Sequence, residues 1–254
     1  MELTLGLKRL DGRVVHFVLT VESHRARVWA RETAPLRLPA FCPERHINLD
    51  GSFCLNWDGE QVLDVVDEPS ARVWWETLYR FLLDQERASK LGRWPTSDGW
   101  AHGGAAGFQK GALLAAGRLG VRFVEALHDK GITVVSQPRR GSNPDSTLDV
   151  MLHGRHLYSV WTTRQRVVNK KRPCFCQSDR PKRAKRIGRC RVHADDARDL
   201  AFALKRWEAA EAEFWRMAAA RPCCGTCSNC PLSAQATRAD GMSTASAATR
   251  IKKR

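Results

Sequence analysis

The nine cysteines of the chain fall into two regions with different patterns. Cys42 and Cys54 stand alone in the N-terminal half, and the other seven lie between positions 174 and 230. In a reducing compartment, such thiols are more often metal ligands, nucleophiles or buried groups than disulfides. The division predicts two different cysteine chemistries in a chain whose 254 residues suffice for one large domain or two modest ones.

Positive charge is concentrated in one short stretch. Residues 170–191 carry ten basic side chains against the single Asp179, whereas residues 1–169 carry 22 basic and 19 acidic ones. A local basic patch indicates an acidic partner, nucleic acid included, and it fits a solvated surface equally well. The basic run 180–186 contains no aromatic residue that would stack on bases.

The first 85 residues or so have the pattern of a sheet followed by a helix. Residues 3–10 and 13–21 alternate or run apolar around Asp11-Gly12, a hairpin turn signal, and residues 27–30 add a third strand. Three prolines between positions 35 and 43 predict an extended segment. Residues 67–70 then predict a helix start, and the helix continues to about Gln85 with an apolar face. That face consists of Trp74, Leu78, Phe81 and Leu82.

The second half mixes helices with short strands. A helix is predicted over about 105–127, with Gly120 as a point where it splits, and another from Asp195 or Asp196 to Ala220. Between them, residues 132–136, 148–152 and 157–168 are β-like, and residues 139–144 form a loop. The Ala-, Ser- and Thr-rich segment 233–254 predicts a disordered tail.

No hydrophobic stretch approaches the roughly 20 residues that span a bilayer. The N-terminus lacks the basic and apolar regions of a signal peptide. The expected location is therefore the cytoplasm.

The most specific motif is the segment CPERHINLDGSFCLNW, residues 42–57. It resembles the active-site stretch of ubiquitin-conjugating enzymes, in which a His-Pro-Asn motif precedes Gly-x-hydrophobic-Cys-Leu. Residues 51–55, Gly-Ser-Phe-Cys-Leu, match the second part residue for residue. The order of strands, proline-rich segment, cysteine and helices also matches, over roughly residues 1–125.

The motif departs from the family pattern in three respects. His46 occupies the place of the family's asparagine eight residues before the cysteine, Asn48 lies six before it, and the proline is replaced. The N-terminal helix that helps to bind the activating enzyme is also missing. This pattern resembles the divergent bacterial conjugating enzymes of antiphage, CBASS-type operons. In some of those operons the target is a cGAS-like nucleotidyltransferase.

The resemblance implies an α+β fold. A UBC-like antiparallel meander sheet with helices would be followed by a small mixed segment with a cysteine-rich, zinc-binding region. The expected divisions are a catalytic domain over 1–128, a β-rich connecting segment over 129–169, a cysteine-rich segment with a helix over 170–231, and a basic tail over 232–254.

The resemblance makes Cys54 the nucleophile that carries a ubiquitin-like protein as a thioester. Thioester exchange needs a reachable thiolate on a loop, and attack by a lysine amine passes through an oxyanion that one well-placed donor stabilises by about 3 kcal/mol. His46 or Asn48 would be that donor, and a protonated His46 would also lower the pKa of Cys54. The alternative is that Cys54 is a small buried hydrophobe.

Two further residues and the partners complete this hypothesis. His102, in a glycine-rich loop before a helix, is a secondary candidate for the catalytic cleft, although a helix cap is the commoner role. Cys42 is interpreted as structural. The resemblance implies a ubiquitin-like modifier and an activating enzyme encoded nearby, because the chain shows no Gly-rich adenylating site of its own.

The C-terminal cysteines are interpreted as metal ligands. Cys174, Cys176, Cys190 and His193 supply three thiolates and an imidazole, which can close a tetrahedral zinc site. Residues 173–178 resemble the start of the SEC-C zinc motif. The second group also has the spacing of metal ligands. It is interpreted as one site shared with the first group, as one of two neighbouring zinc sites or, less favoured, as an iron–sulfur cluster. Cysteine pairs that form on oxidation are the alternative. This second group consists of Cys223, Cys224, Cys227 and Cys230.

Two functions of different classes follow. The first is a conjugating transferase that passes a ubiquitin-like protein, or a target's own C-terminus, from Cys54 to an amine in antiphage defence. The second is a non-enzymatic zinc-binding protein that recognises nucleic acid or a protein through its basic C-terminal half. They separate on whether Cys54 is required.

Overall fold

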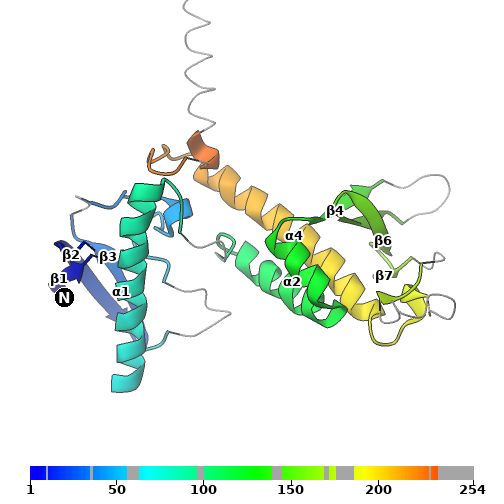
Figure 1. Ribbon diagram of the computed structural model, residues 1–254, viewed down its shortest axis with the longest axis horizontal. Coiled ribbons are helices and arrows are strands. Elements are labelled where there is room, and N and C mark those ends of the chain that lie inside the picture. Colours follow the sequence, from blue (N-terminus) through cyan, green and yellow to red (C-terminus); the bar gives the residue numbers. More distant parts are fainter. Residues whose placement is uncertain are drawn as a thin grey trace, which may run out of the picture. The chain divides into compact units, whose positions relative to one another are not determined.

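The computed structural model describes residues 1–9, 11–34, 37–55, 63–95, 100–138, 145–168, 172–175, 186–228 and 230–233 (Figure 1). The chain divides into two compact units. The first unit combines Met1–Ser97 with Trp215–Arg254, and the second unit is Asp98–Phe214. The long helix α4 (Ala194–Ala218) therefore begins in the second unit and ends in the first.

The first unit contains an antiparallel meander of three strands. β1 (Glu2–Lys8), β2 (Val14–His24) and β3 (Arg27–Glu32) lie in the order β1-β2-β3. The turn between β1 and β2 contains Gly12, whose φ of 81° suits a residue without a side chain. Alternate residues of β2, including Phe17 and Leu19, are fully buried. The predicted hairpin and third strand are confirmed.

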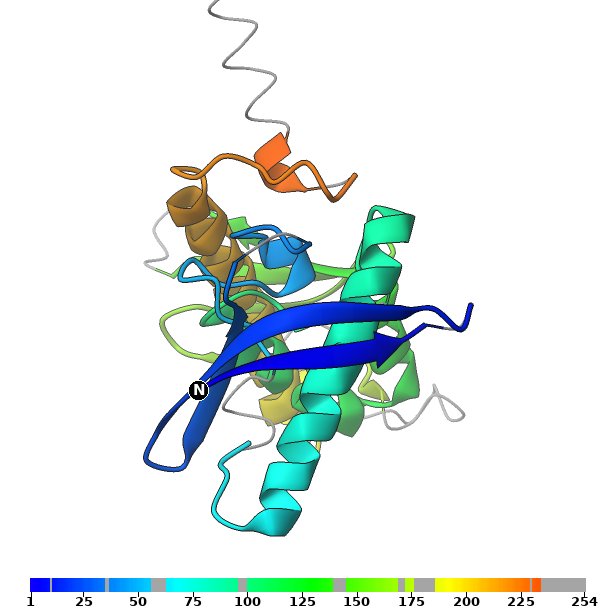
Figure 2. The same ribbon diagram turned by 90° about the vertical axis from the view of Figure 1, so that its left-hand side faces the viewer.

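Helix α1 (Glu68–Leu91) packs against this sheet and completes the core (Figure 2). It begins with a capping box between Asp67 and Ser70, as the sequence predicts. It runs six residues past the expected end at Gln85, because Gly92 in the left-handed conformation is what terminates it. Trp74 anchors the helix, since its ring N–H donates to the carbonyl oxygen of Val28 on β3 at 3.0 Å. All four apolar residues expected on the buried face are buried.

The second unit joins helices to a separate antiparallel sheet. The strands β4 (Ile132–Gln137), β5 (Thr147–Leu152), β6 (Arg155–Trp161) and β7 (Arg166–Val167) lie in chain order. Helices α2 (Ala105–Leu119) and α3 (Val121–His128) separate at Gly120, as expected. Their small buried side chains share one core with this sheet and with α4. The two helices therefore belong to the second unit, whereas the sequence analysis had assigned residues up to 128 to the catalytic domain.

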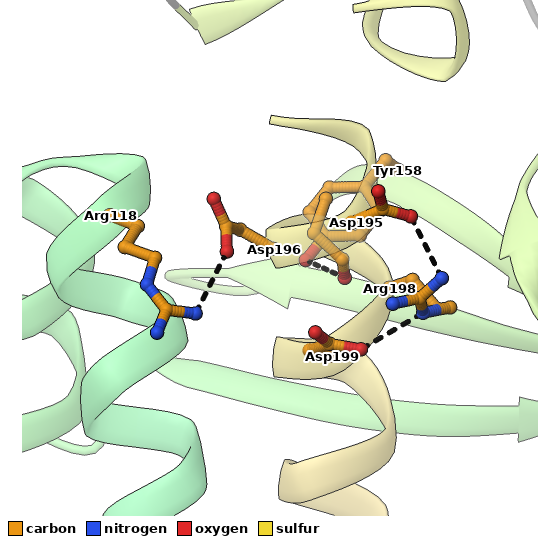
Figure 3. A network of polar contacts seen from close by, with 7 residues as sticks. Arg118, Tyr158, Asp195, Asp196, Arg198 and Asp199 are labelled. Carbon is orange, nitrogen blue, oxygen red and sulfur yellow. Dashed lines mark hydrogen bonds and ion pairs between the residues drawn. The ribbon is translucent and has the colours of Figure 1, made fainter. Parts of the chain in front are cut away.

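The start of α4 is tied to its surroundings by polar contacts (Figure 3). The buried Tyr158 hydroxyl, on β6, donates to the carbonyl oxygen of Ala197 at 2.9 Å. Arg118 on α2 pairs with Asp196 at 3.2 Å, and Arg198 pairs with Asp195 at 2.8 Å. Acids in the first turn also complement the positive end of the helix dipole. These contacts fix the helix at the end where a metal-ligand cluster lies.

The architecture confirms the α+β class, with two antiparallel sheets and packed helices. In the described part of the chain, no helix is long and apolar enough to cross a membrane. The expected loop at 139–144, the basic residues 180–185 and the tail from residue 234 lie outside the described residues.

Candidate active site and cysteine clusters

Cys54 lies at the end of a short bridged segment with its side chain exposed. Phe53 pairs with Ile47, and its backbone N–H donates to the carbonyl oxygen of Ala30 on β3 at 2.8 Å. The Phe53 ring is buried and stacks on Phe81 of α1, with ring centroids 4.9 Å apart. Because side chains alternate along an extended segment, a buried Phe53 turns the next residue outward. Cys54 is the one exposed cysteine among those that the structure describes.

His46 lies directly across from Cys54. The backbone N–H of Cys54 donates to the carbonyl oxygen of His46 at 2.8 Å. His46 has a φ of 54°, and its ring meets Trp94 edge to face at 4.9 Å. A positive φ is unusual for a residue other than glycine, and the Trp94 contact holds the ring in place. The backbone bond makes His46 the direct neighbour of Cys54 across the bridged segment.

Asn48 is engaged in the turn before the cysteine. Its amide donates to the Ser52 hydroxyl at 3.0 Å, and its backbone N–H donates to the Ser52 carbonyl at 2.9 Å. Asp50 accepts from both the backbone and the hydroxyl of Ser52, and these bonds lower the pKa of Asp50. Asn48 therefore braces the turn over residues 48–52.

A buried arginine supports the loop that carries Cys54, and the sequence analysis did not identify this residue. Arg45, at the end of the 3-10 helix η1 (Pro43–Arg45), is 2 % exposed. Its guanidinium donates to the side-chain and backbone oxygens of Gln85 on α1, at 2.8 and 3.0 Å. The Gln85 amide donates back to the Arg45 carbonyl oxygen. A reciprocal set of buried bonds fixes η1, and hence the cysteine loop, to α1.

We predict that Arg45→Ala lowers the free energy of unfolding of the first unit by about 3 kcal/mol. The substitution leaves the buried side-chain and backbone oxygens of Gln85 without their guanidinium donor, and it opens a cavity. Urea titration followed by tryptophan fluorescence measures the change. Arg87→Ala, which removes an exposed ion pair on the same helix, is the control and should cost less than about 1 kcal/mol. Equal effects of the two variants would contradict this role of Arg45.

His102 lies in the second unit and has partners there. Its ring Nδ1 is 2.6 Å from a carboxylate oxygen of Glu211 on α4, and its backbone N–H donates to the other oxygen at 3.1 Å. The ring also stacks on Phe214 at 4.8 Å. These contacts join the start of α2 to α4. The catalytic role proposed for His102 stays a prediction.

Three of the expected metal ligands lie together at the N-terminal end of α4. In the part of the chain that the structure describes, the ligand atoms of Cys174, Cys190 and His193 all lie within 4.8 Å of one another. The Nδ1 atom of His193 is 3.4 Å from the sulfur of Cys174 and 3.7 Å from that of Cys190. Both cysteines are buried in the core of the second unit. Cys176 lies outside the described residues.

The three ligands fit a tetrahedral ion. Bonds of about 2.3 Å to sulfur and 2.0 Å to nitrogen place tetrahedral ligand atoms roughly 3.5–3.8 Å apart, and the observed sulfur-to-nitrogen distances match. Burial opposes the Cys190 thiolate, but hydrogen bonds from the backbone of Val192 and the side chain of Cys174 prevail and lower the pKa of Cys190 to about 6. The cluster is thus suited to hold a metal ion in the thiolate form.

The C-terminal cysteines form a second cluster in the first unit. Cys223 and Cys230 hydrogen-bond each other, while Cys224 and Cys227 meet Cys42, which the sequence analysis had interpreted as structural. A hydrogen bond from Cys42 lowers the pKa of Cys224 to about 5, with help from the nearby positive charge of Arg45. No local pattern predicts this contact, because 185 residues separate Cys42 from Cys227.

Two family models match the chain. The model described as "Cysteine-rich domain, C-terminal to E2 domain" covers residues 101–232, which is more than half of the chain. The model described as "Prokaryotic E2 domain" covers residues 1–96. The chain belongs to this family of prokaryotic E2 proteins with a C-terminal cysteine-rich domain. Comparisons with curated proteins and with solved structures gave no match.

The E2 match gives the first domain a ubiquitin-conjugating-like role, and it implies a ubiquitin-like partner in general terms. It confirms the resemblance noted in the sequence for the N-terminal part. The two matches meet between residues 96 and 101, close to the division of the compact units at Ser97. The cysteine-rich match contains both the Cys174 cluster and the C-terminal cysteines, and it ends at residue 232.

Proposed function

We propose that this E2 protein is a transferase that carries a ubiquitin-like protein, or the C-terminus of its target, as a thioester on Cys54 and passes it to an amine. The observation that carries the proposal is the exposure of Cys54 directly after the buried Phe53. A nucleophile must be reachable yet held in place, and the buried Phe53 supplies the anchor next to it.

His46 is the proposed donor to the oxyanion that forms when the amine attacks. It lies across from Cys54, and Trp94 holds its ring, whereas Asn48 already donates its amide to Ser52. In the transfer step the amine nitrogen forms a bond to the thioester carbonyl carbon, and the carbon–sulfur bond then breaks. The Cys54 thiolate leaves, the amine loses a proton to solvent, and the products are an amide and the regenerated thiol.

We predict that His46→Gly slows transfer to lysine about 100-fold while thioester formation on Cys54 changes little. Glycine accepts the positive φ but offers no donor, and asparagine tolerates that φ and keeps an N–H group. His46→Asn should therefore retain most of the transfer rate. Single-turnover discharge of the loaded protein to free lysine measures both variants. Equal loss in His46→Gly and His46→Asn would contradict a donor role.

Zinc is the proposed occupant of the Cys174, Cys190 and His193 cluster, with Cys176 as the fourth ligand. Soft thiolates and an imidazole in tetrahedral spacing favour zinc over harder ions. A closed set of four protein ligands leaves no position for substrate, so the role is structural. The proposed setting is an antiphage operon that encodes the modifier, the activating enzyme and the target, with a cGAS-like nucleotidyltransferase as one such target.

The test of the function is the intact mass of the protein co-expressed with its neighbouring genes, with and without a thiol reductant. We expect an added mass that disappears on reduction and that identifies the modifier. Absence of any adduct, with the neighbours shown to be expressed, would overturn the proposal. In that case the alternative to examine is a zinc-binding protein that recognises nucleic acid or a protein through residues 170–191.

A further inference from the structure

Cys42 is a buried thiol that the proposed transfer reaction does not use. It precedes η1 in the E2 domain and is 1 % exposed. Its sulfur lies 4.0 Å from that of Cys227, and its side chain also hydrogen-bonds Cys224. Both partners belong to the C-terminal segment after α4, in the same compact unit as Cys42. Cys42 therefore contacts two thiols that come from a distant part of the chain.

The sulfur spacing fits shared metal ligands better than it fits a covalent pair. A disulfide requires about 2.05 Å between sulfurs, so Cys42 and Cys227 are not bonded. Two thiolates bound tetrahedrally to one zinc ion lie roughly 3.8 Å apart, close to the 4.0 Å observed. The buried Arg45 lies near enough to stabilise negative charge on Cys224 and Cys227. Excess negative charge on several thiolates would thus be partly compensated.

The C-terminal segment is shaped to present its sulfurs. In Cys224-Gly225-Thr226-Cys227, Gly225 has a φ of 69°, which lets the chain turn tightly between the two cysteines. The backbone N–H of Thr226 donates to the sulfur of Cys224, and that of Gly225 donates to Cys223 at 3.4 Å. Backbone donors aimed at sulfur favour the thiolate, the form that binds metals.

We propose that Cys42, Cys224 and Cys227 bind a second zinc ion, with the fourth ligand supplied by the Cys223–Cys230 pair. Soft thiolate ligands favour zinc over harder divalent ions, and the one measured spacing, between Cys42 and Cys227, suits a shared ion. This site lies in the first compact unit, whereas the Cys174 cluster lies in the second. One of its ligands, Cys42, belongs to the E2 domain. The site also stands independently of the thioester, because Cys54 is not one of its ligands.

The zinc would fasten the C-terminal segment to the loop that carries Cys54. Cys42 exchanges two backbone hydrogen bonds with Ile47, and Ile47 pairs in turn with Phe53, the residue before Cys54. At the other end, the backbone N–H of Ser228 donates to the carbonyl oxygen of Gly92, just after α1, at 2.7 Å. A metal ion at Cys42 would therefore restrain residues 42–54 through these backbone links.

The test is the number of zinc ions per full-length chain, measured by native mass spectrometry after purification in zinc-containing buffer. We expect two ions in the unsubstituted protein, one in Cys42→Ser, one in Cys190→Ser and none in the double variant. Cys54→Ser is the matched control and should keep two. Two ions retained in Cys42→Ser, or a single ion in the unsubstituted protein that Cys190→Ser removes, would overturn the proposal.

A second measurement on the unsubstituted protein does not depend on the folding of a variant. Stepwise chelation, iodoacetamide labelling and peptide mapping should show Cys42, Cys224 and Cys227 becoming reactive together as one zinc ion leaves. Hydrogen exchange at the Cys54 amide, which donates to His46, should rise in the same step. Continued protection of Cys42 after both ions are gone, or a disulfide that contains it, would contradict the metal site.

Discussion

Replacing Cys54 with alanine is expected to abolish the reductant-sensitive adduct and all transfer to lysine. The methyl group offers no nucleophile, and Cys54 is the one exposed cysteine among those described, the others being buried or partly buried. Because the side chain points outward, the free energy of unfolding should change by less than about 0.5 kcal/mol. Gel analysis of charging reactions with the co-expressed modifier measures the adduct, and urea titration measures the stability.

The structure offers a control for this loss of activity. Ser52→Ala removes a side chain two residues away that braces the turn through Asp50 and Asn48, and it should leave a reduced but measurable adduct. An adduct that survives in Cys54→Ala would place the thioester on another cysteine. An adduct lost equally in Ser52→Ala would attribute the effect to the loop rather than to the thiol.

Removing the metal ion that we propose for the Cys174 cluster is expected to unfold the part of the second unit around the N-terminal end of α4. Cys174 and Cys190 are core residues there, and loss of the proposed ion would leave two buried thiols and an imidazole without the ligand bonds that hold them. Structural zinc sites can supply on the order of 10 kcal/mol of folding free energy, comparable with the whole stability of a domain. Cys190→Ala should therefore expose α3, β6 and the start of α4 to rapid hydrogen exchange.

Val192→Ala is the matched control, since this side chain lies between two of the ligands but is 67 % exposed. It should leave hydrogen exchange in the second unit unchanged. The first-unit strands β1 and β2 should stay protected in both variants, because their core does not share residues with the cluster. Full protection of α3 and β6 in Cys190→Ala would show that the apolar core holds without the metal.

The regular elements were predictable because their signals are local. The hairpin follows from Asp11-Gly12 between apolar runs, the start of α1 from Asp67 to Ser70, and the split between α2 and α3 from Gly120. Turn residues, helix caps and apolar periodicity act within a few residues. The apolar pattern predicts an end of α1 at about Gln85, which is too early. No residue between Gln85 and Leu91 strongly disfavours a helix, so α1 continues until Gly92 ends it.

The division of the chain was harder to predict, because packing decides it. α2 and α3 follow the E2 motif closely in sequence, yet their small side chains pack with the second sheet and α4. The return of residues after Trp215 to the first unit has no sequence signal. Helical periodicity shows which face is buried but not which partner covers it.

The candidate sites divide in the same way. The sequence singles out Cys54 and the pair of Cys190 and His193 as candidates, because the residues of each motif lie close together in the chain. The contact of Cys42 with the C-terminal cysteines could not be predicted, since it joins segments 185 residues apart. The buried Arg45 was also missed, because arginine is seldom fully buried and its bond to Gln85 becomes visible only in three dimensions.

The most direct test of the central claim is to trap the adduct on Cys54→Ser co-expressed with the neighbouring genes. A hydroxyl at this position should form an oxyester in place of the thioester. We predict an adduct that withstands thiol reductant, is cleaved by hydroxide, and maps by peptide mass spectrometry to the tryptic segment that contains position 54. No adduct in Cys54→Ser, while the unsubstituted protein forms a reductant-sensitive adduct that maps to a different cysteine, would contradict Cys54 as the thioester nucleophile.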